Sequence, residues 1–280
     1  MTAVHSAEFF RENGFARTGR IMSREEAGGI RTLVERFERE HPEAVGKLDL
    51  KASLLFPSLD RLSAHPAIMA RLTEVMGPNI MCHSAAFRNK APDGRTFVGW
   101  HQDTAYERID PPKVVAWLAV TDCTVENGCL RFIPGSQEWG ALRHVETGNP
   151  DSMLTHSHHI VDDFDESLAV DVPLEAGEGV LFHYGVVHGS APNHSDDRRM
   201  AVFFDYIRPD SVKQGERESA RLIHGVDEAG HYDHEPAPAT DYGCAEIAAH
   251  RAGVQKLAAN FYADWEGDIE ALSGNARNRT

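Results

Sequence analysis

Trp100-His101-Gln102-Asp103 is the stretch from which the fold can be worked out, and a distant histidine, His188, completes it. In a β-strand, residues two apart project from the same face. His101 and Asp103 can therefore bind one ion while Gln102 points elsewhere. The pattern alone is weak evidence, because the chain contains 16 histidines. The surrounding sequence has to decide what it means.

Two imidazoles and one carboxylate form the ligand set of non-haem iron(II) oxygenases. Such ligands occupy one face of the metal and leave positions for a cosubstrate and for oxygen. Three alternatives stay open from these residues. His101 and Asp103 could be a buried hydrogen-bonded pair, the three ligands could hold zinc in a hydrolase, or the site could belong to a metal-binding protein without turnover.

The sequence on both sides of this stretch alternates between short apolar segments and turn signals such as Asn127-Gly128 and Pro134-Gly135. Segments rich in β-branched and aromatic residues between turns are typical of strands. Many short strands predict an antiparallel sandwich or a jelly-roll barrel. We expect strands at Ile80–Phe87, Val114–Val120, Cys129–Ile133, Val180–Tyr184 and Met200–Ile207.

Helices are expected before and after this β-unit. Ser23 and Glu26 form a capping box at the start of an amphipathic segment. A second helix should cover 66–76, and a third should run from about 243 to 265. The sequence thus predicts one domain over residues 1–280, made of N-terminal helices (1–78), a jelly-roll core (79–210) and a C-terminal loop and helix (211–280).

The formal net charge of −15 disfavours nucleic acid and anionic membranes as partners. The N-terminal residues show no secretory signal. Four cysteines are scattered without a CxxC pair, which suggests a reducing compartment. We therefore expect a cytoplasmic protein whose partner is a small-molecule substrate.

Residues 140–168 are polar and contain three closely spaced histidines, His156, His158 and His159. We expect a solvated loop there, and a second metal site is the alternative. Loops of this length inside a compact domain are often functional.

Arg199 begins the last predicted strand and can clamp a carboxylate with two parallel hydrogen bonds. Ser190, two residues after His188, can add a hydroxyl to the same carboxylate. This arrangement suits 2-oxoglutarate, because its distal carboxylate requires a fixed cation. Arg199 could instead pair with Asp196 or Asp197.

Taken together, the motifs resemble the phytanoyl-CoA dioxygenase family of Fe(II)/2-oxoglutarate oxygenases from about residue 5 to residue 210. The stretches that carry the resemblance are Trp100-His101-Gln102-Asp103, Ala116-Trp117-Leu118-Ala119, Glu126-Asn127-Gly128-Cys129-Leu130-Arg131-Phe132-Ile133-Pro134-Gly135-Ser136, His188-Gly189-Ser190-Ala191-Pro192-Asn193 and Arg199.

The resemblance implies a mainly β protein with flanking helices, in which a double-stranded β-helix (a cupin-like jelly roll) carries the site. It implies that iron is held by His101, Asp103 and His188, and that oxygen takes an open position on the metal. It also implies a set of residues that hold 2-oxoglutarate. These are Arg199 and Ser190, with help from Gln102, Trp117 and Lys90.

Related halogenases have a small residue in place of the metal carboxylate. Asp103 is present here, so hydroxylation of an aliphatic C–H bond is expected. The first choice of substrate is an aminoethylphosphonate or an N-methylated relative, hydroxylated beside phosphorus. Another small molecule or a natural-product intermediate is the alternative. The candidate substrate-binding residues are Arg88, Arg95, Tyr106, His183 and Asp205, and each could equally be structural.

Overall fold

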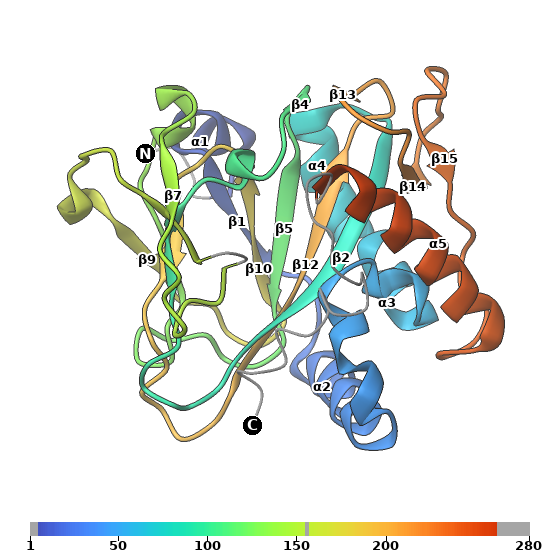
Figure 1. Ribbon diagram of the computed structural model, residues 1–280, viewed down its shortest axis with the longest axis horizontal. Coiled ribbons are helices and arrows are strands. Elements are labelled where there is room, and N and C mark those ends of the chain that lie inside the picture. The colour runs from blue at the N-terminus through green and yellow to red at the C-terminus, as the bar shows by residue number, and fades with distance from the viewer. Residues whose placement is uncertain (1–4, 155–156, 262–280) are drawn as a thin grey trace.

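Two mostly antiparallel sheets form the centre of the computed structural model, which describes residues 5–154 and 157–261 (Figure 1). The large sheet has the order β1 (Phe15–Arg20), β10 (Glu178–His183), β5 (Val114–Ala119), β12 (Arg199–Ile207), β2 (Ile80–Lys90), β14 (Ser219–His224) and β15 (Asp233–His234). The small sheet has the order β3 (Val98–His101), β11 (His188–Ser190), β6 (Leu130–Phe132) and β9 (Val170–Val172).

This pair of sheets is the predicted jelly roll. All five predicted strands are confirmed, and their bounds differ from the predicted ones by three residues at most. Sequence neighbours are mostly not sheet neighbours: β12 lies between β5 and β2, and β11 lies between β3 and β6. The fold therefore brings the end of β3 next to the start of β11, with His101 directly opposite His188 in the register.

The side chains of β12 alternate between two environments. Met200, Val202 and Phe204 are fully buried against the helices, in the largest apolar cluster. Arg199 and Asp205 face the other way, into the space between the two sheets. Since successive strand residues point to opposite faces, one strand contributes to the core and to the cavity at once.

The helices are α1 (Ala7–Asn13), α2 (Arg24–Glu40), α3 (Pro57–Ser63), α4 (Pro66–Met76) and α5 (Cys244–Phe261). Helices α1 to α4 pack on the outer face of the large sheet, and α5 lies beside β14. In Figure 1, α3 and α5 are on the right and β9 is on the left. Ser23 and Glu26 form the predicted capping box, with hydrogen bonds in both directions. Short 3-10 turns occur at η1 (Pro42–Asp49), η2 (Ala52–Leu54), η3 (Asp103–Ala105), η4 (Ser136–Trp139) and η6 (Glu166–Leu168).

The polar segment 140–168 is not a plain solvated loop. Its described part contains two paired strands, β7 (His144–Glu146) and β8 (His158–Ile160), and β8 packs beside β3. His158 and Glu146 line the cavity as a result. The polar composition of this segment hid both strands from the sequence analysis. His156 lies outside the described residues, and the described residues hold one potential metal-binding cluster, which does not include His158 or His159.

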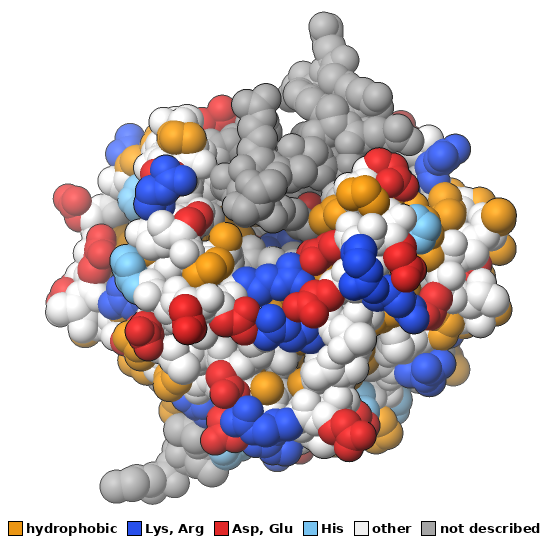
Figure 2. Space-filling model, turned by 90° about the horizontal axis from the view of Figure 1, so that it is seen from below, with side chains coloured by type: hydrophobic (Ala, Val, Ile, Leu, Met, Phe, Trp, Pro, Cys, Tyr) orange, Lys and Arg blue, Asp and Glu red, His pale blue; other side chains and the backbone are white. Residues whose placement is uncertain are grey.

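Two further short strands, β4 (Ile109–Asp110) and β13 (Val212–Lys213), pair with each other. The prediction of helices alone before residue 79 and of loop and helix after residue 210 is wrong in part, because β1, β14 and β15 lie there and extend the large sheet. Acidic and basic side chains are interspersed on the face shown in Figure 2. No helix among the described residues is long and apolar enough to span a membrane.

Candidate active site

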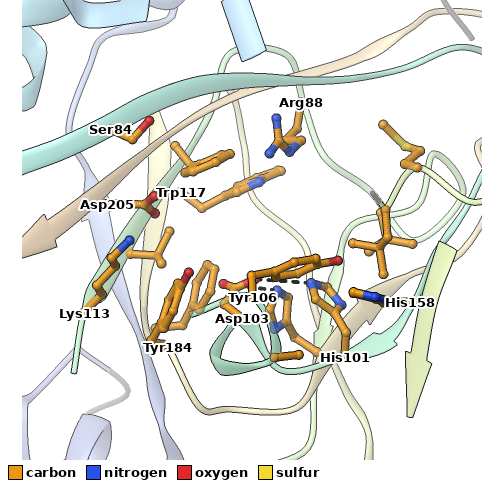
Figure 3. Close-up of a pocket in the computed structure, with 18 of the residues that line it drawn as sticks. Ser84, Arg88, His101, Asp103, Tyr106, Lys113, Trp117, His158, Tyr184 and Asp205 are labelled. Atoms are coloured by element: carbon orange, nitrogen blue, oxygen red, sulfur yellow. Dashed lines mark ion pairs between the residues drawn. The ribbon is translucent and has the colours of Figure 1, made fainter. Parts of the chain in front are cut away.

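His101, Asp103 and His188 come together at one side of the space between the sheets (Figure 3). Their nearest ligand atoms all lie within 4.8 Å of one another. His101 Nε2 is 3.4 Å from one carboxylate oxygen of Asp103, and His188 Nε2 is 4.0 Å from the other. These two nitrogens and one carboxylate could hold a single metal ion.

The orientation of both imidazoles suits metal binding. His101 Nδ1 lies 2.9 Å from the carbonyl oxygen of Gly99, and His188 Nδ1 lies 3.1 Å from that of Val186. Each Nδ1 can therefore donate its hydrogen to the backbone, which leaves the Nε2 lone pair for a metal. Such support of the second nitrogen is the usual arrangement at histidine metal sites.

Asp103 is not on the strand, contrary to our expectation. β3 ends at His101, and Asp103 opens the 3-10 turn η3. Gln102 between them keeps an extended backbone (φ −113°, ψ 137°), so the two ligands still project to one side.

Burial sets the charge state of the ligands. Burial and the neighbouring His101 lower the pKa of His188 to about 4, so the ring is neutral at physiological pH. Burial alone would raise the pKa of Asp103, but His188 and His101 outweigh it and the net shift is downward. Neutral imidazoles and an ionised carboxylate are the forms that bind a metal.

Arg199 lies at one end of the cavity and is only 1% exposed. Its Nη1 donates to the carbonyl oxygen of Gly128 at 2.7 Å, and its guanidinium lies over the ring of Trp117 at 5.3 Å. Its Nε has no partner among the described residues. Arg31 and not Arg199 pairs with Asp197. Arg199 is thus a buried cation with capacity left for a carboxylate.

Gly128 is required by this arrangement. Its φ of +75° is left-handed, and an added Cβ would lie 2.1 Å from the carbonyl oxygen of Ala191. Any side chain would push apart the turn that presents the Gly128 carbonyl to Arg199.

Lys90 pairs with Arg199 in the register between β2 and β12 and is completely buried. Its Nζ donates to Ser190 Oγ at 2.6 Å and also to the carbonyl oxygen of Ala191. Burial, then the nearby Arg199, lowers the pKa of Lys90 to about 6, so the amine is mostly neutral at physiological pH. Arg199 therefore supplies the positive charge at this end of the cavity, where Ser190 and Arg199 line it and Lys90 lies behind Ser190.

The cavity has a volume of about 410 Å³. Of the predicted substrate-binding residues, Arg88, Tyr106 and Asp205 line it, and Trp117 lines it as well. Arg88 is stacked 4.5 Å above the ring of Phe203.

Besides Lys90, which lies behind Ser190, three predicted site residues do not line the cavity. The amide of Gln102 is engaged by three backbone groups, those of Gly140, Gly185 and Leu142, at 2.8–2.9 Å. Arg95 lies on the surface, where its side chain is 72% exposed and 3.7 Å from Asp151.

His183 is the third. It occupies the opposite strand parity from the cavity-lining Phe182, and its Nδ1 accepts from the backbone N–H of Gly185 at 3.0 Å. The family resemblance made Gln102 a candidate, and side-chain chemistry made Arg95 and His183 candidates. In the structure none of the three side chains lines the cavity.

The structure adds residues that the sequence analysis missed. Lys113 and Tyr184 line the far end of the cavity, and Leu257 and Ala258 of α5 close over it. Lys113 and Tyr184 stand at the ends of predicted strands, where alternation gave a usable signal. Nothing in the local sequence of α5 indicates that its residues reach the cavity.

Comparisons with known proteins identify the family to which the chain belongs. The family model for phytanoyl-CoA dioxygenase (PhyH) matches residues 10–201. Phytanoyl-CoA dioxygenase domain-containing protein 1 of Danio rerio is 32% identical over 161 residues, 56% of this chain and 55% of that protein. A protein of Stutzerimonas stutzeri, named a probable alpha-ketoglutarate-dependent hypophosphite dioxygenase, is 30% identical over 168 residues, 56% of each chain. The chain thus spans just over half the length of these two relatives.

A solved structure described as the non-heme monooxygenase ThoJ, in its apo form, superposes with a TM-score of 0.83 at 27% identity. The match covers 92% of this chain and 97% of that one. The family model covers more than half of the chain and includes His101, Asp103 and His188. The chain belongs to the phytanoyl-CoA dioxygenase family of Fe(II)- and 2-oxoglutarate-dependent oxygenases.

Proposed function

We propose that the protein hydroxylates an aliphatic C–H bond of a small zwitterionic metabolite, with an aminoethylphosphonate or an N-methylated relative as the first choice, attacked beside phosphorus. The observation that carries the oxygenase proposal is that the metal-binding cluster and the proposed 2-oxoglutarate site line one cavity. The His101–Asp103–His188 cluster lines its side, and Arg199 and Ser190 line one end.

The two nitrogens and the carboxylate fit Fe(II), since their chemistry matches the facial set of oxygenases. Bound iron would supply the oxidation of the C–H bond, coupled to the conversion of 2-oxoglutarate and oxygen into succinate and CO2. In this proposal Arg199 and Ser190 bind the distal carboxylate, Lys90 supports Ser190, and Trp117 packs beside the cosubstrate. These residues fix the orientation of 2-oxoglutarate relative to the metal ligands.

The protein also has to keep bulk water away from the reacting carbon. The walls of the cavity are apolar where they approach the metal ligands, with Phe182, Leu130 and Val98 among the lining residues. Leu257 and Ala258 of α5 cover the cavity from the other side. A substrate held there reacts between these apolar walls.

Arg88 supports an anionic group on the substrate. Its guanidinium lines the cavity, stacks on Phe203, and has no carboxylate partner within the described residues. A guanidinium binds the oxygens of a phosphonate or carboxylate well. The relative named for hypophosphite, a phosphorus oxyanion, adds support for phosphorus in the substrate.

The proposal is tested with purified protein, Fe(II), ascorbate and 2-oxoglutarate, by measuring succinate release on adding each member of a phosphonate and amino-acid panel. Coupled succinate and a product heavier by one oxygen are expected with an aminoethylphosphonate. A His188→Ala variant is the inactive control. If succinate release is coupled only to an acyl chain or a ring compound, the choice of substrate is contradicted and the oxygenase activity is not. Succinate formation unaffected by His188→Ala would contradict the oxygenase.

A further inference from the structure

The end of the cavity away from Arg199 is formed by His83, Ser84 and Asp205, and we refer to these three residues as the acceptor corner. We propose that the acceptor corner binds the ammonium group of the substrate, and that Asp205 determines specificity for a cation. The inference rests on the proposed function, because it places the substrate between this corner and the metal ligands.

A β-bulge builds the corner. In the register of β2 and β12, Asp205 pairs with Ser84 and Tyr206 pairs with Cys82, so His83 is the extra residue. Bulges of this kind change the direction of side chains and are common beside active sites. Here the bulge lets both His83 and Ser84 line the cavity, although they are adjacent in sequence.

Asp205 carries a charge that the surrounding residues leave unbalanced. Behind it lies a buried ionic network in which Lys113 pairs with Glu107, and Lys213 lies 2.8 Å from Glu107 and contacts Glu218. Two lysines and two glutamates make this network neutral. Asp205 adds one negative charge. Its carboxylate has no hydrogen bond or ion pair to any described residue, although Lys113, Arg88 and Lys51 lie near enough to act on its pKa.

His83 adds a second acceptor. Its Nε2 is 2.5 Å from Glu218 Oε2, so the ring hydrogen is assigned to Nε2 and Nδ1 holds a lone pair. Burial, then the charge of Lys113, lowers the pKa of His83 to about 3, so the ring stays neutral. Nδ1 is buried and has no partner among the described residues. A buried acceptor without a donor is costly, and it indicates a missing partner.

Ser84 completes the corner. Its Oγ accepts from the backbone N–H of Lys51 at 3.1 Å and keeps one further lone pair. Figure 3 shows Ser84, Lys113 and Asp205 together on the side of the cavity away from His101 and His158. A primary ammonium has three N–H donors and no acceptor. It would satisfy a carboxylate and a neutral acceptor at once, whereas an anionic group would be repelled by Asp205.

The opposite charge on the substrate is expected near Arg88. In the register of β2 and β12, Arg88 pairs with Ala201, four residues before Asp205. Four strand residues correspond to roughly 13 Å, and the long Arg88 side chain, which extends over Phe203, shortens this separation. A short zwitterion fits between the two groups.

The test uses the Fe(II)- and 2-oxoglutarate-loaded enzyme without oxygen, and measures binding by calorimetry. Two matched pairs are compared: 2-aminoethylphosphonate with 2-hydroxyethylphosphonate, and 3-aminopropanoate with 3-hydroxypropanoate. We expect at least one ammonium compound to bind about 30-fold or more tightly than its hydroxyl partner, as for a buried charge pair. Asp205→Asn should abolish this preference while leaving 2-oxoglutarate affinity intact.

Glu146→Gln is the matched control, because Glu146 is a cavity-lining carboxylate residue that belongs neither to the metal ligands nor to the acceptor corner, and it lies 3.7 Å from His158 and is 64% exposed. It should keep the ammonium preference. Equal binding of hydroxyl compounds, a preserved preference in Asp205→Asn, or failure of both ammonium compounds to bind would overturn the inference. Aerobic succinate release is measured separately. If no succinate is released but the ammonium compounds still bind more tightly, the proposed oxygenase activity is contradicted and the acceptor corner is not. If succinate is released but the ammonium compounds bind no more tightly, the acceptor corner is contradicted and the oxygenase activity is not.

Discussion

Arg199 and Asp205 are six residues apart on β12 and project from the same face into the two ends of one cavity. Six strand residues span about 20 Å. Arg199 is stacked on Trp117 and hydrogen bonded to Gly128, while Asp205 has no hydrogen bond to a described residue. A single strand therefore carries a buried cation for the cosubstrate and a buried anion for the substrate, with the metal ligands facing it from the other sheet.

Asp103→Ala is expected to abolish substrate hydroxylation, because it removes the anionic member of the ligand set. Some iron should remain bound through His101, His188 and 2-oxoglutarate. Bound metal is removed with a chelator, Fe(II) is added back, and iron content and product formation are then measured. Wild type should regain activity and the variant should not. Normal turnover by the variant would show that the metal lies elsewhere.

Arg199→Ala should raise the KM for 2-oxoglutarate by about 30-fold or more, since it removes one partner of a desolvated charge pair. Arg198→Ala is the control. Arg198 precedes Arg199 in sequence but forms ion pairs with Glu38 and Glu35 on α2, so its loss should leave the KM close to that of wild type. An equal effect of both variants would mean that the cosubstrate carboxylate is not held by Arg199.

Gln102→Ala tests the placement of Gln102 outside the cavity. The variant loses an amide that engages three backbone groups, and unsatisfied buried groups cost about 1–3 kcal/mol each. Denaturant unfolding should show that loss, with the KM for 2-oxoglutarate unchanged. Gln137→Ala should cost less, because, among the described residues, this partly buried amide engages only the carbonyl oxygens of Arg11 and Glu12, to which its Nε2 donates. If the KM for 2-oxoglutarate rises and the free energy of unfolding is unchanged, Gln102 binds the cosubstrate after all.

Asp205 should make the stability of the protein pH-dependent. Burial raises its pKa to about 6, with help from Asp103 and against Lys113, Arg88 and Lys51. The folded-state pKa lies above the unfolded value of about 3.9, so the ionised group destabilises the fold above pH 6. This penalty is lost as the pH falls from about 6 to about 4.

The magnitude is at most about 3 kcal/mol, because one pKa unit corresponds to about 1.4 kcal/mol. Asp205→Asn should therefore be more stable than wild type at pH 8, and the difference should shrink toward pH 4. Chemical unfolding of both proteins across this range measures it, and groups such as His188 and His250 cancel in the comparison. If the difference in the free energy of unfolding stays constant between pH 4 and pH 8, the Asp205 carboxylate is in contact with water.

Local sequence patterns determined much of the architecture. The Ser23 capping box, Pro66 at the start of α4 and the alternation along β12 are all confirmed. These features depend on interactions within one element, such as a side chain bonding to the backbone three residues away or a two-residue period. The pattern Trp100-His101-Gln102-Asp103 with His188 and Arg199 predicted side chains that the structure brings into one cavity.

Tertiary structure decided which other side chains reach that cavity. It turned Gln102 and His183 away, and it added Leu257 from α5, whose sequence gave no indication of a shared site. The bulge at His83 could not be foreseen, because it exists only in the register of β2 against β12. A strand's alternation is fixed by its own backbone, whereas the partners it meets depend on how the sheets close over each other.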